Sequence, residues 1–244
     1  MNFRRKHVDI RVALTCKLLS MNDFTCLIIS ISIPAGILAG LGAVAVFNRM
    51  PARWLCDYNE EPCELLKRDG AKRINNYPWG FIFSAFFAAA AVKMALFNWQ
   101  YAIVAFVSLW TLLVIAIADR KYMIIPDQFV ILLAITAFAY PHYNNGYLFP
   151  LWGALIGGGC MFIIGIFGKI IYKKETLGFG DVKLFAAVGL VAGPVGVSFI
   201  LAASSFLSCA AFVTEIVRKN IKRTDTLALG PYIAASAAVY LIFV

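Results

Sequence analysis

Leu177-Gly178-Phe179-Gly180-Asp181-Val182-Lys183 places an aspartate after two alternating glycines, at the junction of two long apolar runs. Two glycines and an aspartate also describe an ordinary turn that ends in a helix N-cap, where the carboxylate accepts backbone N–H hydrogen bonds. The position of this motif favours a functional site over a simple turn, because ionisable side chains at the edges of membrane spans are candidate functional residues by default. A second aspartate, Asp119, occupies a comparable edge earlier in the chain.

The composition indicates a membrane protein. Of the 244 residues, 61% are hydrophobic and 14% are charged, and the mean hydropathy is +0.80. A soluble domain carries roughly 25% charged residues. The net charge of +9 comes from Lys and Arg that lie mostly between apolar runs, as topology determinants do, so nucleic acid is not an expected partner. We therefore predict an all-α fold, a polytopic membrane helix bundle.

The apolar runs predict about eight transmembrane helices of about 20 residues each. The first has a small-residue face, Gly36, Gly40 and Gly42, that is suited to close helix packing. Gly193-Pro194 is either a tight reversal between two spans or a kink in one long helix. The predicted spans are 25–47, 79–97, 100–118, 129–140, 148–172, 183–193, 195–217 and 226–244.

Two segments are expected outside the membrane helix bundle of residues 79–244. We predict that residues 1–24 form a basic N-terminal extension. Its Arg and Lys residues lie around a broken apolar pattern, which is typical of an amphipathic helix on the membrane surface. The polar stretch 48–78 is long enough for a short cytoplasmic loop subdomain.

Charge placement predicts the orientation. After the first span, nearly all Lys and Arg lie in alternate connections, whereas the connections between these contain none. By the positive-inside rule the charged set is cytoplasmic, so both aspartates are expected on the cytoplasmic side. The charged connections are 48–78, 119–128, 173–183 and 218–225, and the uncharged ones are 98–100, 141–147 and 193–195.

A pair of aspartates is suited to peptide hydrolysis. Two carboxylates within hydrogen-bond reach cannot both ionise easily, so one keeps a proton, and the pair can deprotonate a water while protonating a carbonyl or a leaving amine. The glycines before Asp181 would let the backbone approach an extended substrate. Asp127 competes with Asp119 as the partner, but Pro126-Asp127 at the start of an apolar run predicts a helix start. We therefore expect a structural or supporting role for Asp127 and a catalytic one for Asp119.

Several ordered motifs resemble those of the type IV prepilin peptidases, membrane aspartic proteases with a G-x-G-D motif. That family's pattern is an aspartate, a few mostly polar residues, an apolar residue and Pro-Asp. Some sixty residues later comes G-x-G-D-x-K, and near the C-terminus a Gly-Pro motif lies in the last span. An N-R-x-P motif ends its first span. The resemblance covers about 36–244. The matching segments are Phe47-Asn48-Arg49-Met50-Pro51, Asp119…Ile125-Pro126-Asp127, Gly178-Phe179-Gly180-Asp181-Val182-Lys183 and Leu229-Gly230-Pro231-Tyr232.

The resemblance implies an integral membrane aspartic endopeptidase. Its substrates would be prepilins or pseudopilins, cut on the cytoplasmic side of the bacterial inner membrane between a short basic leader and an apolar helix that lies in lipid. No metal or cofactor is expected. The implied catalytic pair is Asp119 and Asp181, and the implied supporting or substrate-binding residues are Gly178, Gly180, Lys183, Asp127 and Pro126, with Lys183 and Arg120 orienting the carboxylates.

The chain departs from the family in its cysteines. Many bacterial members carry a larger loop with two C-x-x-C pairs and also N-methylate the new N-terminus, whereas this chain has only Cys56 and Cys63 in a short loop. Two thiols do not complete a four-cysteine zinc site. The sequence therefore gives N-methyltransferase activity no support.

Two other classes share parts of this pattern. A transporter or membrane assembly factor could use the two aspartates as a proton or cation site, but such sites lie near the bilayer midplane rather than at one edge. An intramembrane protease of the presenilin type shares G-x-G-D. The spacing to Pro126-Asp127 and the small size favour the prepilin peptidase class.

Overall fold

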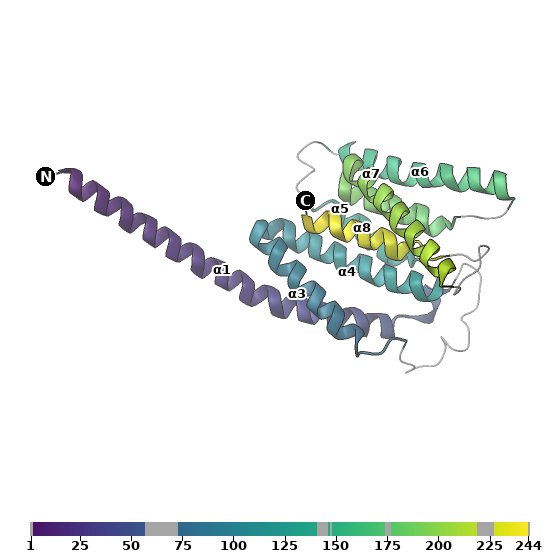
Figure 1. The fold of residues 1–244 in the computed structure, drawn as a ribbon, viewed down its shortest axis with the longest axis horizontal. Helices are drawn as coiled ribbons and strands as arrows, with labels where there is room; N and C mark the ends of the chain where they lie inside the picture. Colours follow the sequence, from purple (N-terminus) through teal and green to yellow (C-terminus); the bar gives the residue numbers. More distant parts are fainter. Residues whose placement is uncertain are drawn as a thin grey trace.

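The computed structural model describes residues 2–56, 73–140, 146, 148–173, 177–218 and 227–243. Within these ranges the protein is helical and contains no strand, which confirms the predicted all-α class (Figure 1). The elements are α1 (Asn2–Arg49), the short 3-10 helix η1 (Ala52–Leu55), α3 (Trp79–Phe97), α4 (Trp99–Tyr122), α5 (Asp127–Ala137), α6 (Leu148–Tyr172), α7 (Phe179–Val217) and α8 (Gly230–Phe243).

Five helices in the described part of the chain are long and apolar enough to cross a membrane, namely α1 from Thr25, α3, α4, α6 and α7. Helices α5 and α8 are apolar but have only 11 and 14 residues, fewer than the roughly 20 that span a bilayer. The multi-pass membrane character is confirmed. The count of about eight spans is not confirmed, because two of the predicted runs form helices shorter than a usual span.

Helix α1 continues without interruption from Asn2 to Arg49. At 1.5 Å per residue it is about 72 Å long, more than twice the hydrocarbon thickness of a bilayer, and only Thr25–Arg49 qualifies as a span. Its N-terminal half projects beyond the other helices (Figure 1). Since no helix end marks the boundary, the division between a basic extension 1–24 and the first span stays a prediction. The predicted loop subdomain is described only at 48–56 and 73–78, and Cys63 lies outside the described residues.

Small residues bring helix pairs close together, as the sequence predicts for α1. A Cβ atom added to Gly36 would meet the backbone of Ala88 in α3, and one added to Gly40 would meet the backbone of Ser84. Gly42 has no heavy atom within 4 Å of such a Cβ, so it is not part of this face. The packing prediction therefore holds for two of the three glycines.

Helices α4 and α7 form the centre of the bundle, and α6 lies at its edge. In the most apolar window of α7, 61% of the residues are buried, against 17% in α6. Helix α6 packs mainly on α7, with Gly153 against the backbone of Gly189 and Gly157 against the carbonyl oxygen of Phe185. Most of the surface of α6 is left for lipid.

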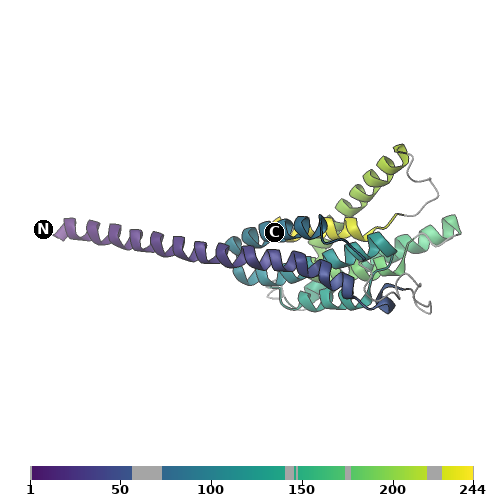
Figure 2. The same ribbon diagram turned by 90° about the horizontal axis from the view of Figure 1, so that it is seen from below.

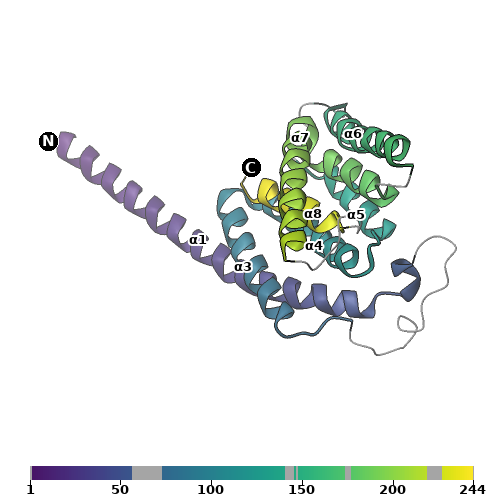
Figure 3. The same ribbon diagram turned by 45° about the vertical axis from the view of Figure 1, so that its right-hand side comes forward.

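Helix α7 breaks at Gly193, whose φ of 69° and ψ of −177° are not helical. The break divides α7 into a first arm, residues 179–192, and a second arm, residues 194–217, which point in different directions (Figure 3). In a straight helix Asp181 and Cys209 would be about 42 Å apart, yet both line one cavity. Of the two alternatives at Gly193-Pro194, the structure therefore has the sharp turn. The second arm runs back toward the end of the bundle at which the first arm begins.

The described parts of two predicted cytoplasmic connections, 48–78 and 119–128, meet at one end of the bundle. At the C-terminus of α1, Asn48 Nδ2 donates to the Ile74 carbonyl oxygen at 3.0 Å, and the Ile74 N–H donates to Asn48 Oδ1 at 2.8 Å. Arg73 donates to the Phe47 carbonyl oxygen at 3.2 Å, and Lys121 Nζ at the end of α4 donates to the Arg73 carbonyl oxygen. These bonds hold the chain before α3 against the ends of α1 and α4.

The break in α7 can be tested with Gly193→Ala. Alanine is strained at this φ and ψ, and its Cβ would lie 2.5 Å from Phe149 Cε1, so we expect the free energy of unfolding in detergent to fall by about 1–3 kcal/mol. Gly159→Ala in α6 is the matched control, because nothing lies within 4 Å of its added Cβ. Equal stability of the two variants in a denaturant titration would show that α7 does not need this conformation.

Candidate active site

A cavity of about 540 Å³ opens at the end of the bundle where the predicted cytoplasmic connections meet. Its volume lies in the range of small-ligand and substrate sites, about 300–1,000 Å³. Four parts of the chain form its walls: the end of α4, the start of α7, the end of α7 and the connection before α8. The lining residues are Asp119, Met123, Leu177, Gly178, Asp181, Ser208, Cys209, Phe212, Leu227, Ala228 and Leu229.

Asp119 lies in the last turn of α4 and is only 5% exposed. Its Oδ2 accepts a hydrogen bond of 2.7 Å from the Gly230 N–H, the first residue of α8. Helix N-termini carry partial positive charge and unpaired N–H groups, which stabilise an anion placed there. Helix α4 ends three residues later, where Met123 adopts a left-handed conformation and its N–H donates to the Asp119 carbonyl oxygen at 2.8 Å.

Glycine at position 230 leaves room for this contact. A Cβ on residue 230 would lie 2.7 Å from Asp119 Oδ2, closer than real Cβ atoms come to other heavy atoms, and 3.0 Å from Asp119 Cβ and Cγ, which is tighter than most real Cβ contacts. In the sequence, Gly230-Pro231 matches a motif of the resembling family, but the motif alone predicts no contact with Asp119. The sequence signal for a helix start at this position is a Gly-Pro pair that opens an apolar run, since proline is favoured in the first turn of a helix.

Asp181 lies in the first turn of α7. Its N–H donates to the Gly178 carbonyl oxygen at 3.1 Å, and a Cβ on Gly178 would lie 3.5 Å from Asp181 Oδ2. The carboxylates of Asp119 and Asp181 line the same cavity and are near enough to interact electrostatically. The structure thus brings together the two aspartates that the sequence paired, and their catalytic role stays a prediction.

The two motif glycines occupy different surroundings. Gly178 lines the cavity, where backbone could approach a substrate. Gly180 instead lies against Ile125, and a Cβ on it would be 3.2 Å from Ile125 Cβ. Gly180 therefore lets the segment between α4 and α5 pack closely on the start of α7, which helps to place Asp119 beside Asp181.

Asp127 begins α5 directly after Pro126, as the sequence predicts. Its carboxylate pairs with Lys183, whose Nζ lies 3.0 Å from Oδ1 and 3.1 Å from Oδ2. Lys183 Nζ also lies 5.2 Å from the centroid of the Phe179 ring. Asp127 and Lys183 are not among the residues that line the cavity, and Arg120 is exposed. The pair connects the start of α5 to the start of α7.

The fold and the cavity define a class of protein: a multi-pass helical membrane protein with two aspartates in one cavity at an end of its bundle. Comparison with known proteins is more specific. The type IV leader peptidase family matches residues 106–213, a range that contains Asp119, Asp181, the first arm of α7 and most of its second arm. The chain belongs to this family.

Named relatives agree with this assignment. Leader peptidase HopD of Escherichia coli is 32% identical over 124 residues, 50% of this chain and 80% of that protein. HopD of Salmonella typhimurium is 29% identical over 130 residues, 52% of this chain and 84% of that protein. The prepilin leader peptidase/N-methyltransferase of Aeromonas hydrophila is 26% identical over 166 residues, 64% of this chain and 54% of that protein. The chain thus spans about half the length of the curated N-methyltransferase relatives it matches. No solved structure matches it.

The close contact at position 230 predicts an unusual effect of Gly230→Ala. Glycine to alanine in the middle of a helix is stabilising by about 0.5–1 kcal/mol. At the first residue of α8 the added methyl must instead displace Asp119 or the start of the helix, and we expect a loss of about 1–3 kcal/mol. Detergent unfolding measures the sign. Ala235→Val, at an exposed position of the same helix, should change stability little; a stabilised Gly230→Ala would contradict the contact.

A double-mutant cycle tests the ion pair between Lys183 and Asp127. Both side chains are partly exposed, so we expect a coupling energy of about 0.5–1 kcal/mol between Lys183→Met and Asp127→Asn in unfolding measurements. A control cycle pairs Asp127→Asn with Lys93→Met, whose ammonium lies over the Phe243 ring near the end of α8 and should couple negligibly. Equal coupling in both cycles would rule out a direct contribution of the pair.

Proposed function

We propose that this protein is an aspartic endopeptidase that removes the leader from prepilins or related pseudopilins. The observation that carries the proposal is that Asp119 of α4 and Asp181 of α7 line one cavity inside the region that matches the leader peptidase family. The chain covers about four fifths of the length of the two HopD proteins. Their names give leader peptidase and no N-methyltransferase. The proposal is therefore limited to peptide hydrolysis.

The proposed reaction places a water and the scissile carbonyl between the two carboxylates. The ionised carboxylate takes a proton from the water while the oxygen of the water bonds to the carbonyl carbon. The protonated carboxyl gives its proton to the carbonyl oxygen. Collapse of the tetrahedral intermediate breaks the C–N bond. The proton taken from water passes from the base to the leaving amine, and the proton on the former carbonyl oxygen returns to the acid carboxylate, so both aspartates regain their starting states. The products are a carboxylic acid on the leader, which ionises in water, and a new N-terminus on the mature chain.

We assign the base role to Asp119. Its Oδ2 accepts the hydrogen bond from Gly230 at the positive end of α8, which stabilises negative charge on that carboxylate. A carboxylate has two oxygens, so Asp119 can hold this bond through Oδ2 and accept the proton from water through Oδ1. Asp181, beside it in the cavity, would then be the acid.

The proposed substrate has a short basic leader and an apolar helix, and the proposed site faces the cytoplasm of a bacterial inner membrane. The support is the set of basic residues around the cavity end of the bundle, which includes Arg49, Arg73, Arg120 and Lys121. Positive residues favour the cytoplasmic face. A cavity at that face would meet a polar leader in water while the helix after it lies in lipid.

Substitution of the aspartates tests the function. Asp119→Ala or Asp181→Ala should reduce cleavage of a co-expressed prepilin by a factor of about 10² to 10⁴, read by the size shift of the substrate, with unchanged amounts of membrane-inserted protein. Asp127→Ala should keep at least partial activity, because Asp127 pairs with Lys183 outside the cavity.

Normal cleavage by either cavity variant would disprove the assignment. A proton or cation site in a transporter predicts the opposite pattern: no cleavage by the unaltered protein, and ion flux into proteoliposomes that is lost in Asp119→Ala and Asp181→Ala.

A further inference from the structure

The second arm of α7 loses its contacts with the bundle before it ends. Its start is well packed, with Val197 and Ile200 fully buried and the Phe199 ring 6.2 Å from the Tyr240 ring at an interplanar angle of 37°. Ser204 is the last buried residue, and among the described residues 205–217 none is buried. Figure 2 shows this end of α7 projecting away from the other helices. It is a helix held at one end, with unoccupied surface at the other.

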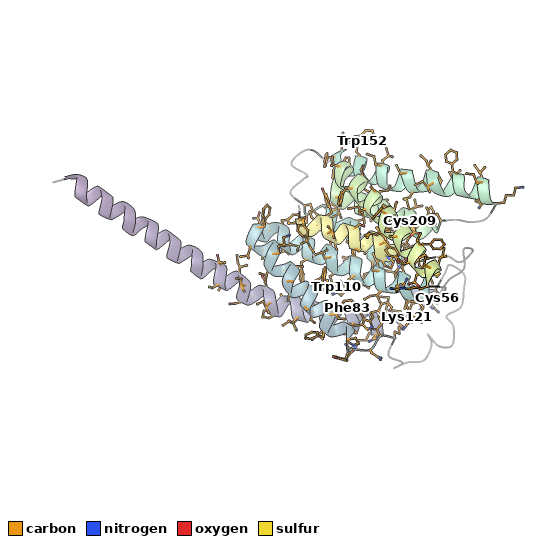
Figure 4. All side chains as sticks on the ribbon, in the orientation of Figure 1. Cys56, Phe83, Trp110, Lys121, Trp152 and Cys209 are labelled. Atoms are coloured by element: carbon orange, nitrogen blue, oxygen red, sulfur yellow. The ribbon has the colours of Figure 1, made fainter. Side chains whose placement is uncertain are left out.

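One face of this projecting end looks onto the two aspartates. Ser208, Cys209 and Phe212 line the cavity that contains Asp119 and Asp181, and their spacing of three and four residues places them on one side of the helix. Figure 4 labels Cys209 at the same end of the bundle as Lys121 and Cys56. The Ser208 hydroxyl donates to the Ser205 carbonyl oxygen at 3.0 Å within its own helix, so this face is effectively apolar.

The remaining walls of the cavity have the same character. Met123, Leu177, Leu227 and Leu229 are apolar, and the two aspartates are the only charged groups among the lining residues that the structure describes. An occupant of this cavity therefore meets two carboxylates among mostly apolar side chains. Such a site fits an apolar segment whose reacting peptide group lies beside it.

We propose that the face of Ser208, Cys209 and Phe212 docks the apolar helix of the substrate next to the scissile bond, an inference that rests on the proposed endopeptidase function. Two small side chains, Ser208 and Cys209, let a second helix approach closely, which is how helices associate in lipid. Phe212, one turn further on, supplies a larger apolar contact. Because the same cavity holds the aspartates, a helix on this face would have its end at Asp119 and Asp181.

Cys209 makes this docking directly testable by disulfide cross-linking in membranes. We would use the full-length chain with Asp119→Asn to prevent cleavage and with Cys209 as its only cysteine. The partner is a full-length prepilin with single cysteines placed in turn through the first two turns of its apolar helix, and copper-phenanthroline is the oxidant. We expect a cross-linked species from at least one substrate position, at ten times or more the yield of the control.

The control retains Cys160 in place of Cys209. Cys160 is also an exposed cysteine in an apolar helix, α6, but it does not line the cavity. Equal yields from both enzymes would indicate random collision in the membrane and would overturn the docking proposal.

Cleavage of the same substrates by the unaltered protein separates the two proposals. Cleavage without any cross-link at Cys209 would refute docking on α7 and leave the endopeptidase intact. A cross-link at Cys209 without cleavage would support docking and refute the endopeptidase. In a second arm of the experiment, Cys209→Trp should raise KM for prepilin about tenfold with little change in kcat, whereas Cys160→Trp should change neither; an unchanged KM in Cys209→Trp would count against the docking face.

Discussion

The hydrogen bond from the Gly230 N–H to Asp119 Oδ2 joins the start of α8 to the end of α4, 111 residues apart in the chain. It buries a carboxylate at the end of α4 by giving it the N-terminus of α8 as a partner. A buried carboxylate without such a partner costs several kcal/mol, so the position of α8 and the burial of Asp119 depend on each other. The absence of a side chain at Gly230 makes the distance of 2.7 Å possible.

The cavity exists because α7 does not continue straight. Its first arm carries Asp181 to the cavity, the break at Gly193 turns the chain, and the second arm returns Ser208, Cys209 and Phe212 to the opposite wall. One helix thus contributes both a carboxylate and an apolar wall. Packing holds the two arms unequally, since α6 and α8 fix the region around the break while the end of the second arm remains exposed.

Several short-range features could be read correctly from the sequence because they depend on neighbouring residues. Pro126-Asp127 starts a helix, Gly36 and Gly40 form a packing face, and the apolar runs are helical. The number of spans could not be read in this way. Helix length in a bundle depends on where packing and capping stop each helix, and α5 and α8 prove too short for the usual span although their residues are apolar.

By itself the sequence determined that this is a helical membrane protein, and it singled out Asp119 and Asp181 by their positions at the edges of apolar runs. Only the tertiary structure decided what surrounds them: Gly230 on Asp119, Lys183 on Asp127, Ile125 on Gly180, and the second arm of α7 across the cavity. The physical reason is that composition and periodicity report how each segment meets water or lipid. Contacts between segments far apart in the chain depend instead on backbone conformation at a few points, above all Gly193, and on which side chains leave room for a close approach.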